Sequence, residues 1–202
     1  MSIVLTPLFM RRALAARLRA PLRALVTLVL RRLGRRTGEI AVVLADDATT
    51  RALNRDWRGM DHATDVITFA YDEHEADADT RAVTGDLVVS MDRVRVQAKR
   101  WKVSEGEELA RLVIHGALHL CGHDHMKAAE RRVMRAYEDA AMSEGAAAIA
   151  ALEKAWPKPS RTTPAPRATR PARPAKPAGP ARRAKSPSRR PVVAKSRARK
   201  GH

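Results

Sequence analysis

Apolar and polar residues follow one another along residues 1–156 in patterns that predict both strands and helices. Short β-branched, apolar runs predict strands at 40–44, 66–71 and 87–90. Longer stretches with apolar residues at helical spacing predict four helices, at about 47–57, 92–101, 104–121 and 127–142. Asp46 and Asp47 are candidate caps for the first of these helices, and Ser104 with Glu107 is a capping box for the third. Strands and helices are mixed rather than strictly alternating. The pattern therefore predicts a single compact α+β domain, in which a small mixed sheet packs with helices.

The first 38 residues are rich in arginine, and Glu39 is the first acidic residue of the chain. Thr6 followed by Pro7 is typical of a helix cap with proline at the first helical position, and the apolar residues after it recur at helical spacing. We expect a helix that belongs to the domain, with Pro21 as a kink position and Gly34 as its end. An arginine-rich, acid-free start also resembles an organellar transit peptide, but the cap and the periodicity favour the folded helix.

Residues 157–202 differ in composition from the rest of the chain. They contain fifteen Lys or Arg, no Asp or Glu and ten of the twelve prolines, so they carry most of the net charge of +17. So few apolar residues do not offset the entropy of ordering a chain, and we expect a disordered tail. Such a basic block is typical of contact with RNA, while a solubilising tail is the alternative. Residues 39–156 remain as the catalytic core.

Residues 115–125 read HGALHLCGHDH and contain the candidate chemistry. His115 and His119 are four residues apart on a predicted helix, so they lie one turn from each other on the same face. Gly122 permits the left-handed backbone that ends a helix, and the turn would bring back His125 as a third ligand. Three neutral imidazoles leave the fourth position of a tetrahedral zinc ion open, as in a catalytic site. The pattern predicts one zinc ion per chain.

Three other residues of this segment have less direct interpretations. Cys121 is the only cysteine, which excludes an intramolecular disulfide and fits a reducing cytosol. Two residues along a helix rotate it away from His119, so we expect an apolar, buried role for it. His123 is expected to be a solvated neighbour. Asp124 is a candidate acceptor for the second nitrogen of a ligand imidazole.

Zinc proteases of the H-E-x-x-H-x-x-G-x-x-H type place three histidines at the same spacing. In those proteases the Glu after the first His is the general base, and here that position is Gly116. The substitution argues against a peptidase, although a zinc hydrolase of another substrate stays open as an alternative.

The HGALHLCGHDH segment resembles the HGxLHLxGxDH signature of the YbeY family of bacterial endoribonucleases. Upstream, LNRDWRGMDHATDVITFAY is similar to the family's LNxxxRxxDxxTDVLSFP segment, and TGDLVVS is similar to its GDIVIS segment. The matched positions of these two segments are Asn54, Arg58, Asp61, Thr64, Asp65, Val66, Phe69, Gly85 and Asp86. The chain departs from the pattern at Ile67, Thr68 and Ala70, and none of these is a predicted metal ligand.

The resemblance implies a zinc-dependent, single-strand-type endoribonuclease of the cytoplasm. Its partners would be ribosomal RNA and ribosomal particles, and its roles would be maturation of the 16S rRNA 3′ end and ribosome quality control. It also implies that Arg58 is functional, which agrees with the suitability of a guanidinium for the charge that phosphodiester cleavage builds on phosphoryl oxygens. Asp61 and Asp65 would either orient Arg58 or cap the adjacent loop, and Asp86 would be functional or structural. No residue is assigned as general base.

Two alternatives to RNA hydrolysis stay open. One is the peptidase-like zinc hydrolase, and the other is a ribosome-associated binding protein whose metal is not catalytic. Assays with RNA and peptide substrates separate the two hydrolases, and binding to ribosomal particles without cleavage would identify the third class.

Overall fold

The computed structural model of the chain describes residues 2–7, 12–71, 81–156 and 192–194, with side chains for 14–71 and 81–156. The elements in chain order are β1 (Ser2–Pro7), α1 (Arg12–Arg32), β2 (Arg36–Ala45), α2 (Asp47–Arg58), β3 (Val66–Tyr71), β4 (Ala82–Ser90), α3 (Met91–Trp101), α4 (Glu105–Leu120), α5 (Ala128–Glu144), α6 (Ala146–Ala155) and β5 (Val192–Ala194). Each strand and helix predicted for residues 40–142 is present, with bounds within a few residues of those expected, except that β4 begins five residues earlier.

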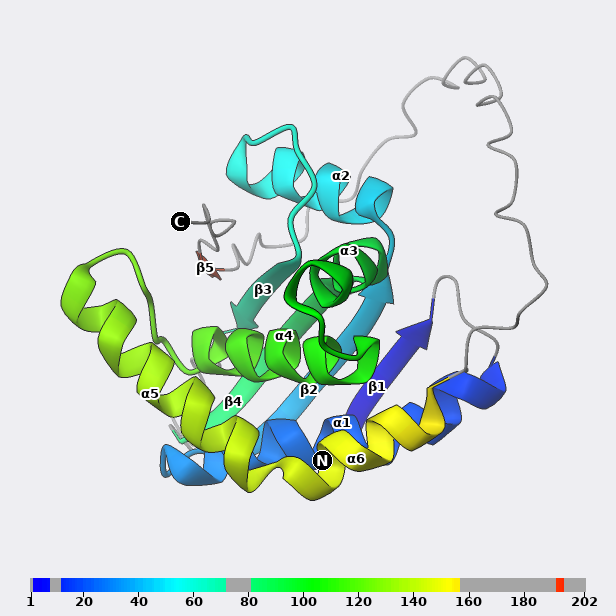
Figure 1. The fold of residues 1–202 in the computed structure, drawn as a ribbon. Coiled ribbons are helices and arrows are strands. Elements are labelled where there is room, and N and C mark those ends of the chain that lie inside the picture. The colour runs from blue at the N-terminus through cyan, green and yellow to red at the C-terminus, as the bar shows by residue number, and fades with distance from the viewer. Residues whose placement is uncertain (1, 8–11, 72–80, 157–191, 195–202) are drawn as a thin grey trace, which may run out of the picture. The chain divides into compact units, whose positions relative to one another are not determined.

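The strands form one mixed sheet in the order β1-β2-β4-β3-β5 (Figure 1). β1 and β4 both pair with β2 in parallel, whereas β3 pairs with β4 and β5 in antiparallel fashion. Parallel neighbours need a crossover connection, which α1 supplies between β1 and β2. The mixed sheet and its helices confirm the α+β class.

Alternate residues of β2 face opposite sides of the sheet, as the period of a strand requires. Ile40, Val42 and Leu44 are buried in the larger hydrophobic cluster, together with residues of α1 and α4. Val43 and Ala45 face the smaller cluster, where Leu53 of α2 packs. Helices therefore cover both faces of the sheet, with α2 on the side opposite to α4.

Helix α4 is the central helix of the larger cluster and contacts α1, α6, β3 and β4. Figure 1 shows it lying across the sheet. From Leu112 to Leu120 only His115 has more than slight exposure, because this stretch is enclosed by the sheet and the neighbouring helices. Because α4 is packed in this way, side chains on its less buried face, such as that of His115, are held in fixed positions.

Gly116 permits the close approach of α4 to the sheet. A Cβ added there would lie 2.6 Å from Cδ1 and 2.8 Å from Cγ of Leu87, and 3.2 Å from Cγ2 of Val66. We expect Gly116→Ala to destabilise the fold by about 1–3 kcal/mol through overpacking. Helix propensity alone predicts the opposite, a gain of about 1 kcal/mol. Urea unfolding shows whether the substitution lowers or raises the free energy of unfolding. An unchanged or raised midpoint would mean that the side chain of Leu87 moves to make room for the added methyl group.

The N-terminal prediction is wrong in one respect. Thr6 and Pro7 end strand β1 and do not cap a helix, and α1 begins only at Arg12. The run from Ser2 to Thr6 extends the sheet beside β2, and a proline is tolerated at the end of an edge strand because no ladder hydrogen bond is needed there. α1 continues through Pro21 and ends before Gly34, whose φ of 65° is left-handed as expected.

Two further elements were not predicted. Helix α6 follows α5 after Gly145 and buries Leu152 and Ala155. Strand β5 lies within the segment expected to be disordered, so that expectation does not hold for Val192–Ala194, whose valines suit pairing with β3. The rest of residues 157–202 and all of residues 72–79, a stretch rich in Asp and Glu that the sequence predicts to be a loop, lie outside the described residues. Among the helices described, none is long and apolar enough to cross a membrane.

Candidate metal centre

Helix α4 carries the first two histidines of the candidate site. Its start is capped as predicted, because the side chain of Ser104 accepts a hydrogen bond from the backbone N–H of Glu107 at 3.0 Å. The helix ends at Leu120, and Gly122 then adopts a φ of 86°. This left-handed residue turns the chain back along the helix, and the turn brings His125 toward His115 and His119.

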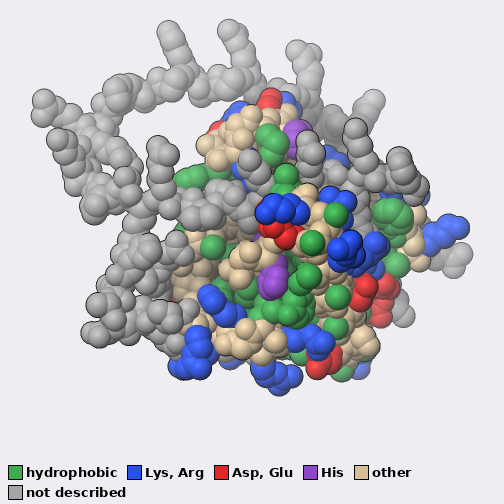
Figure 2. Space-filling view, turned by 90° about the vertical axis from the view of Figure 1, so that its left-hand side faces the viewer, with side chains coloured by type: hydrophobic (Ala, Val, Ile, Leu, Met, Phe, Trp, Pro, Cys, Tyr) green, Lys and Arg blue, Asp and Glu red, His purple; other side chains and the backbone are tan. Residues whose placement is uncertain are grey.

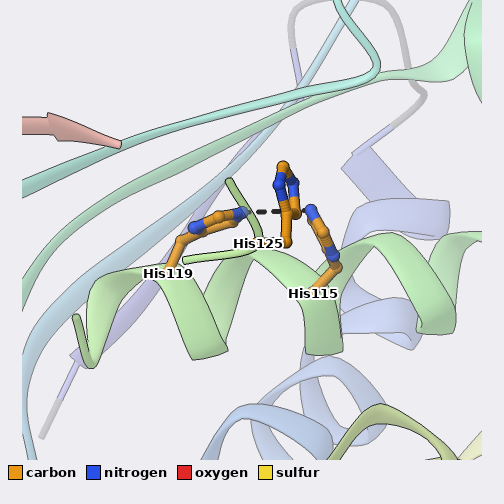
Figure 3. A group of neighbouring side chains, drawn as sticks. All are labelled: His115, His119 and His125. Carbon is orange, nitrogen blue, oxygen red and sulfur yellow. Dashed lines mark hydrogen bonds between the residues drawn. The ribbon is translucent and has the colours of Figure 1, made fainter. Parts of the chain in front are cut away.

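The three histidines converge on one point (Figure 3). One nitrogen from each of His115, His119 and His125 lies within 4.8 Å of the other two, which makes the group a candidate metal site. Nε2 of His119 is 3.1 Å from Nε2 of His115, at hydrogen-bond distance. A metal ion held there would take the place of that shared hydrogen. The structure thus brings together all three residues that the spacing predicted as ligands.

Burial favours the neutral, metal-binding form of two of the three histidines. His119 is 3% exposed, and burial together with its neighbours His115 and His125 lowers its pKa to about 3. Burial, and then His115, also lower the pKa of His125 below its usual value. Neutral imidazoles offer a lone pair to an ion, whereas protonated ones do not. His119 and His125 therefore have lone pairs available for a metal ion at neutral pH.

The site remains open to the surrounding solution on one side. The side chains of His115 and His125 are 18% and 17% exposed. Figure 2, which faces the left-hand side of Figure 1, shows histidine at the surface, with apolar, basic and acidic side chains around it. One basic side chain, that of Arg131, contacts the site, because its Nε donates to the backbone carbonyl of His125 at 3.3 Å. A cation there suits a substrate that carries negative charge.

Glu138 is a functional candidate that the sequence did not single out. It lies on α5, and its Oε1 is 2.5 Å from Nδ1 of His115. The sequence held one signal, since Glu138 is four residues after the buried Met134 and so shares the inward face of α5. An acidic residue on an inward face needs a partner, but the pattern alone does not say which.

The three other residues of the HGALHLCGHDH segment that the sequence singled out, Cys121, His123 and Asp124, are not part of the candidate metal site. Cys121 packs against the larger cluster, and burial raises the pKa of its thiol to about 11, as expected of an apolar role. The ring of His123 lies 5.1 Å from that of Tyr137. Asp124 accepts a hydrogen bond at 2.7 Å from the backbone N–H of His125, while its carboxylate is 3.8 Å from Nδ1 of that residue. Its predicted role toward a ligand imidazole stays a prediction.

Arg58 ends α2, and Gly59 with a φ of 69° caps the helix. All three guanidinium nitrogens of Arg58 are buried and have no hydrogen-bond partner in the described part of the chain. Burial lowers the pKa of this side chain, and the negative charge of Asp65 opposes the decrease. A buried guanidinium without partners has its full donor capacity available for an oxyanion. No contact described here joins Arg58 to the three histidines.

The three aspartates left open by the sequence have structural partners. Asp61 forms a bidentate pair with Arg51, with both distances 2.7 Å, so it does not orient Arg58 by contact. Asp65 accepts hydrogen bonds from the backbone N–H of Val66 and from Gln97. The hydroxyl of Tyr71 donates to Asp86 at 2.7 Å. Asp65 alone of the three acts electrostatically on Arg58 in the described residues.

The environment of Gly116 bears on the protease alternative. Its Cα faces Leu87 and Val66 of the sheet, on the side of α4 that is buried. A glutamate at this position would point into the core, away from a substrate at the histidines. The fold therefore leaves no place at residue 116 for the general base of those proteases.

Fold and site together define a class, that of an α+β protein with a partly open site of three histidines that could hold a metal ion. The family model described as endoribonuclease YbeY matches residues 12–145. The chain belongs to the YbeY family.

Individual relatives agree with this assignment. An endoribonuclease YbeY of Desulfitobacterium hafniense is 41% identical over 111 residues, which are 52% of this chain and 71% of that one. One of Chloroflexus aggregans is 42% identical over 110 residues, 52% and 72% of the two chains. For one of Anaeromyxobacter, at 41% identity, the match covers 56% of this chain and 58% of the relative. A solution structure from Thermotoga maritima, 21% identical, has a TM-score of 0.51 and covers 79% of this chain and 100% of its own, which supports the fold alone.

Proposed function

We propose that this chain is a zinc-dependent, single-strand-type endoribonuclease that acts on ribosomal RNA in the cytoplasm. Its tasks would be maturation of the 16S rRNA 3′ end and ribosome quality control, and its partners ribosomal RNA and ribosomal particles. The observation that carries the proposal is the convergence of His115, His119 and His125 in a chain of the YbeY family. Relatives named endoribonuclease YbeY support the choice of RNA as substrate.

The donor set fits zinc. Imidazole nitrogen is a preferred zinc ligand, and three such ligands are the arrangement of a catalytic site. His115 and His119 would hold the ion through their facing Nε2 atoms, with His125 as the third ligand. A bound zinc ion supplies Lewis acidity toward a phosphoryl oxygen or a water molecule.

Arg58 would stabilise the negative charge that forms on the phosphoryl oxygens during cleavage. Its unpartnered nitrogens support this role, since no protein group in the described residues competes for them. The loss of solvation that lowers its pKa strengthens its interaction with an anion, because charges attract more strongly where water is excluded. The exposed side of the histidine site would admit the RNA strand.

The choice of RNA over peptide is tested with substrates of both kinds. Zinc-loaded chain is incubated with a single-stranded fragment of ribosomal RNA and, separately, with an unstructured protein such as casein. We expect RNA fragments with defined ends and intact casein. Cleavage of casein would support the peptidase alternative instead. Binding of ribosomal particles with no cleavage of either substrate would support a binding protein with a non-catalytic metal.

The basic segment 157–202 is proposed to contact RNA phosphates. Each neutralised phosphate adds roughly −0.7 to −0.9 to the slope of log affinity against log salt, so removing this segment should flatten that slope. We expect weaker RNA binding at low salt, a smaller difference near physiological salt, and unchanged cleavage positions, because charge alone carries no sequence information. Filter binding across a salt series measures the slope. Equal slopes with and without the segment would make it a solubilising appendage.

A further inference from the structure

The carboxylate of Glu138 is enclosed beside the candidate metal centre. Its side chain is 13% exposed, and Oε1 lies 2.5 Å from Nδ1 of His115. Acidic side chains are rarely buried without a partner that compensates the lost hydration. The pairing with His115 compensates part of that lost hydration, and it joins α5 to the helix that carries two of the three histidines.

The contact determines which nitrogen of His115 faces the site. The two nitrogens lie on different edges of the imidazole ring, and Nδ1 is directed to Glu138 while Nε2 is directed to His119. A carboxylate accepts hydrogen bonds and does not donate them, so Nδ1 of His115 carries the hydrogen. Nε2 is then left with its lone pair toward the point where the three histidines converge. Glu138 itself stays on the far side of the ring.

Helix α5 contacts the HGALHLCGHDH segment at two further places. The Nε of Arg131 donates to the backbone carbonyl of His125 at 3.3 Å, and the ring of Tyr137 packs beside that of His123. Met134, one turn before Glu138, is 1% exposed and anchors α5 to the larger cluster. The carboxylate of Glu138 is thus held by an element that is itself fixed in the core.

We propose that Glu138 is a positioning residue, which holds His115 in the tautomer and orientation needed to bind the metal ion. The inference rests on the proposed function, because it assumes an ion at the three histidines. Partners of this kind raise the basicity of a ligand imidazole and reduce the entropy lost when the ion binds. Glu138 acts through His115 and does not touch the ion or the substrate.

The test compares zinc affinity in four full-length proteins: the parent, Glu138→Gln, Glu138→Ala and Asp139→Asn. Asp139 is the next residue on α5 and is exposed, so its substitution makes the same change of charge without the contact. Zinc affinity is measured by competition with a chromophoric chelator. Thermal unfolding of each metal-free protein reports the fold, and ¹⁵N shifts of the His115 ring report its tautomer.

We expect Glu138→Ala to bind zinc about 10–100-fold more weakly than the parent. Glu138→Gln should lose less, because its amide oxygen still accepts from Nδ1–H, and Asp139→Asn should match the parent within about twofold. The ¹⁵N shifts of Glu138→Ala should show a loss of the Nδ1–H tautomer. A role confined to stability would change unfolding without changing zinc affinity.

The outcomes separate the inference from the function on which it rests. A parent that binds no zinc would contradict the proposed function. A parent that binds zinc, with both folded Glu138 variants equal to it, would overturn the inference alone. Should Glu138→Ala fail to fold, Glu138→Leu decides, since leucine keeps much of the volume of the side chain but cannot accept from Nδ1–H of His115. An affinity of that variant equal to that of the parent would reject the role.

Discussion

Replacement of His119 by alanine is expected to reduce zinc from about one ion per chain to almost none, since three imidazoles are the full protein ligand set of such a site and two hold the ion poorly. His119 is the most buried of the three, and its Nε2 faces that of His115. The same loss is expected for alanine at His115 or His125. Emission spectroscopy of protein purified and dialysed in defined zinc measures the content.

A histidine of the same segment provides the control. His123 lies beside Tyr137 and is not among the three converging residues, so His123→Ala should keep its zinc. Retention of zinc by all three alanine variants would refute the assignment of the site. Loss of zinc from His123→Ala at unchanged fold would mean that the ligand set is larger than three histidines.

Arg58→Ala should reduce RNA cleavage by about 10²–10³-fold, the effect typical of removing one donor to developing negative charge. Zinc content should stay at the value of the parent, because no contact described here joins Arg58 to the histidines. Thermal stability should be unchanged or higher, since the substitution removes a buried charge that has no hydrogen-bond partner in the described residues. Single-turnover cleavage at saturating protein measures the effect on the chemical step.

Two further variants identify the property of Arg58 that matters. Arg55 is on the same helix and pairs at the surface with Asp56, so Arg55→Ala should cleave at nearly the parent rate. Arg58→Lys keeps the charge but not the planar fork, and should recover only part of the activity. Parent-like cleavage by Arg58→Ala would remove the residue from the site. Loss of fold would assign it a structural role.

The sequence predicted the convergence of the three histidines and most of the elements around them because those features are local. Spacing along a helix brings His115 and His119 to one face, and Gly122 accounts for the turn that returns His125. The caps at Asp46 and Ser104 likewise act within three residues, and both occur as predicted. Local rules of this kind hold whatever the rest of the fold does.

The features that were not predicted depend on partners distant in sequence. Whether Thr6 and Pro7 belong to a strand or to a helix is decided by pairing with β2, more than thirty residues later. Helix α6 is alanine-rich and short, and it is stabilised by contacts such as that of Trp156 with Glu105 at 2.9 Å. The role proposed for Glu138 depends on its contact with His115, which lies on another helix, so the pattern of α5 alone does not predict it. Tertiary contacts override local patterns in each case.

The central claim is that the three histidines hold a zinc ion that this chain uses to cleave ribosomal RNA. Its most direct test uses precursor 16S rRNA with the parent chain in three states: zinc-loaded, stripped by chelator, and stripped then reloaded with zinc. Mapping of new RNA ends should give the same defined cleavage near the 3′ end in the first and third states and none in the second. Undiminished cleavage by chain shown to contain no metal would contradict the account.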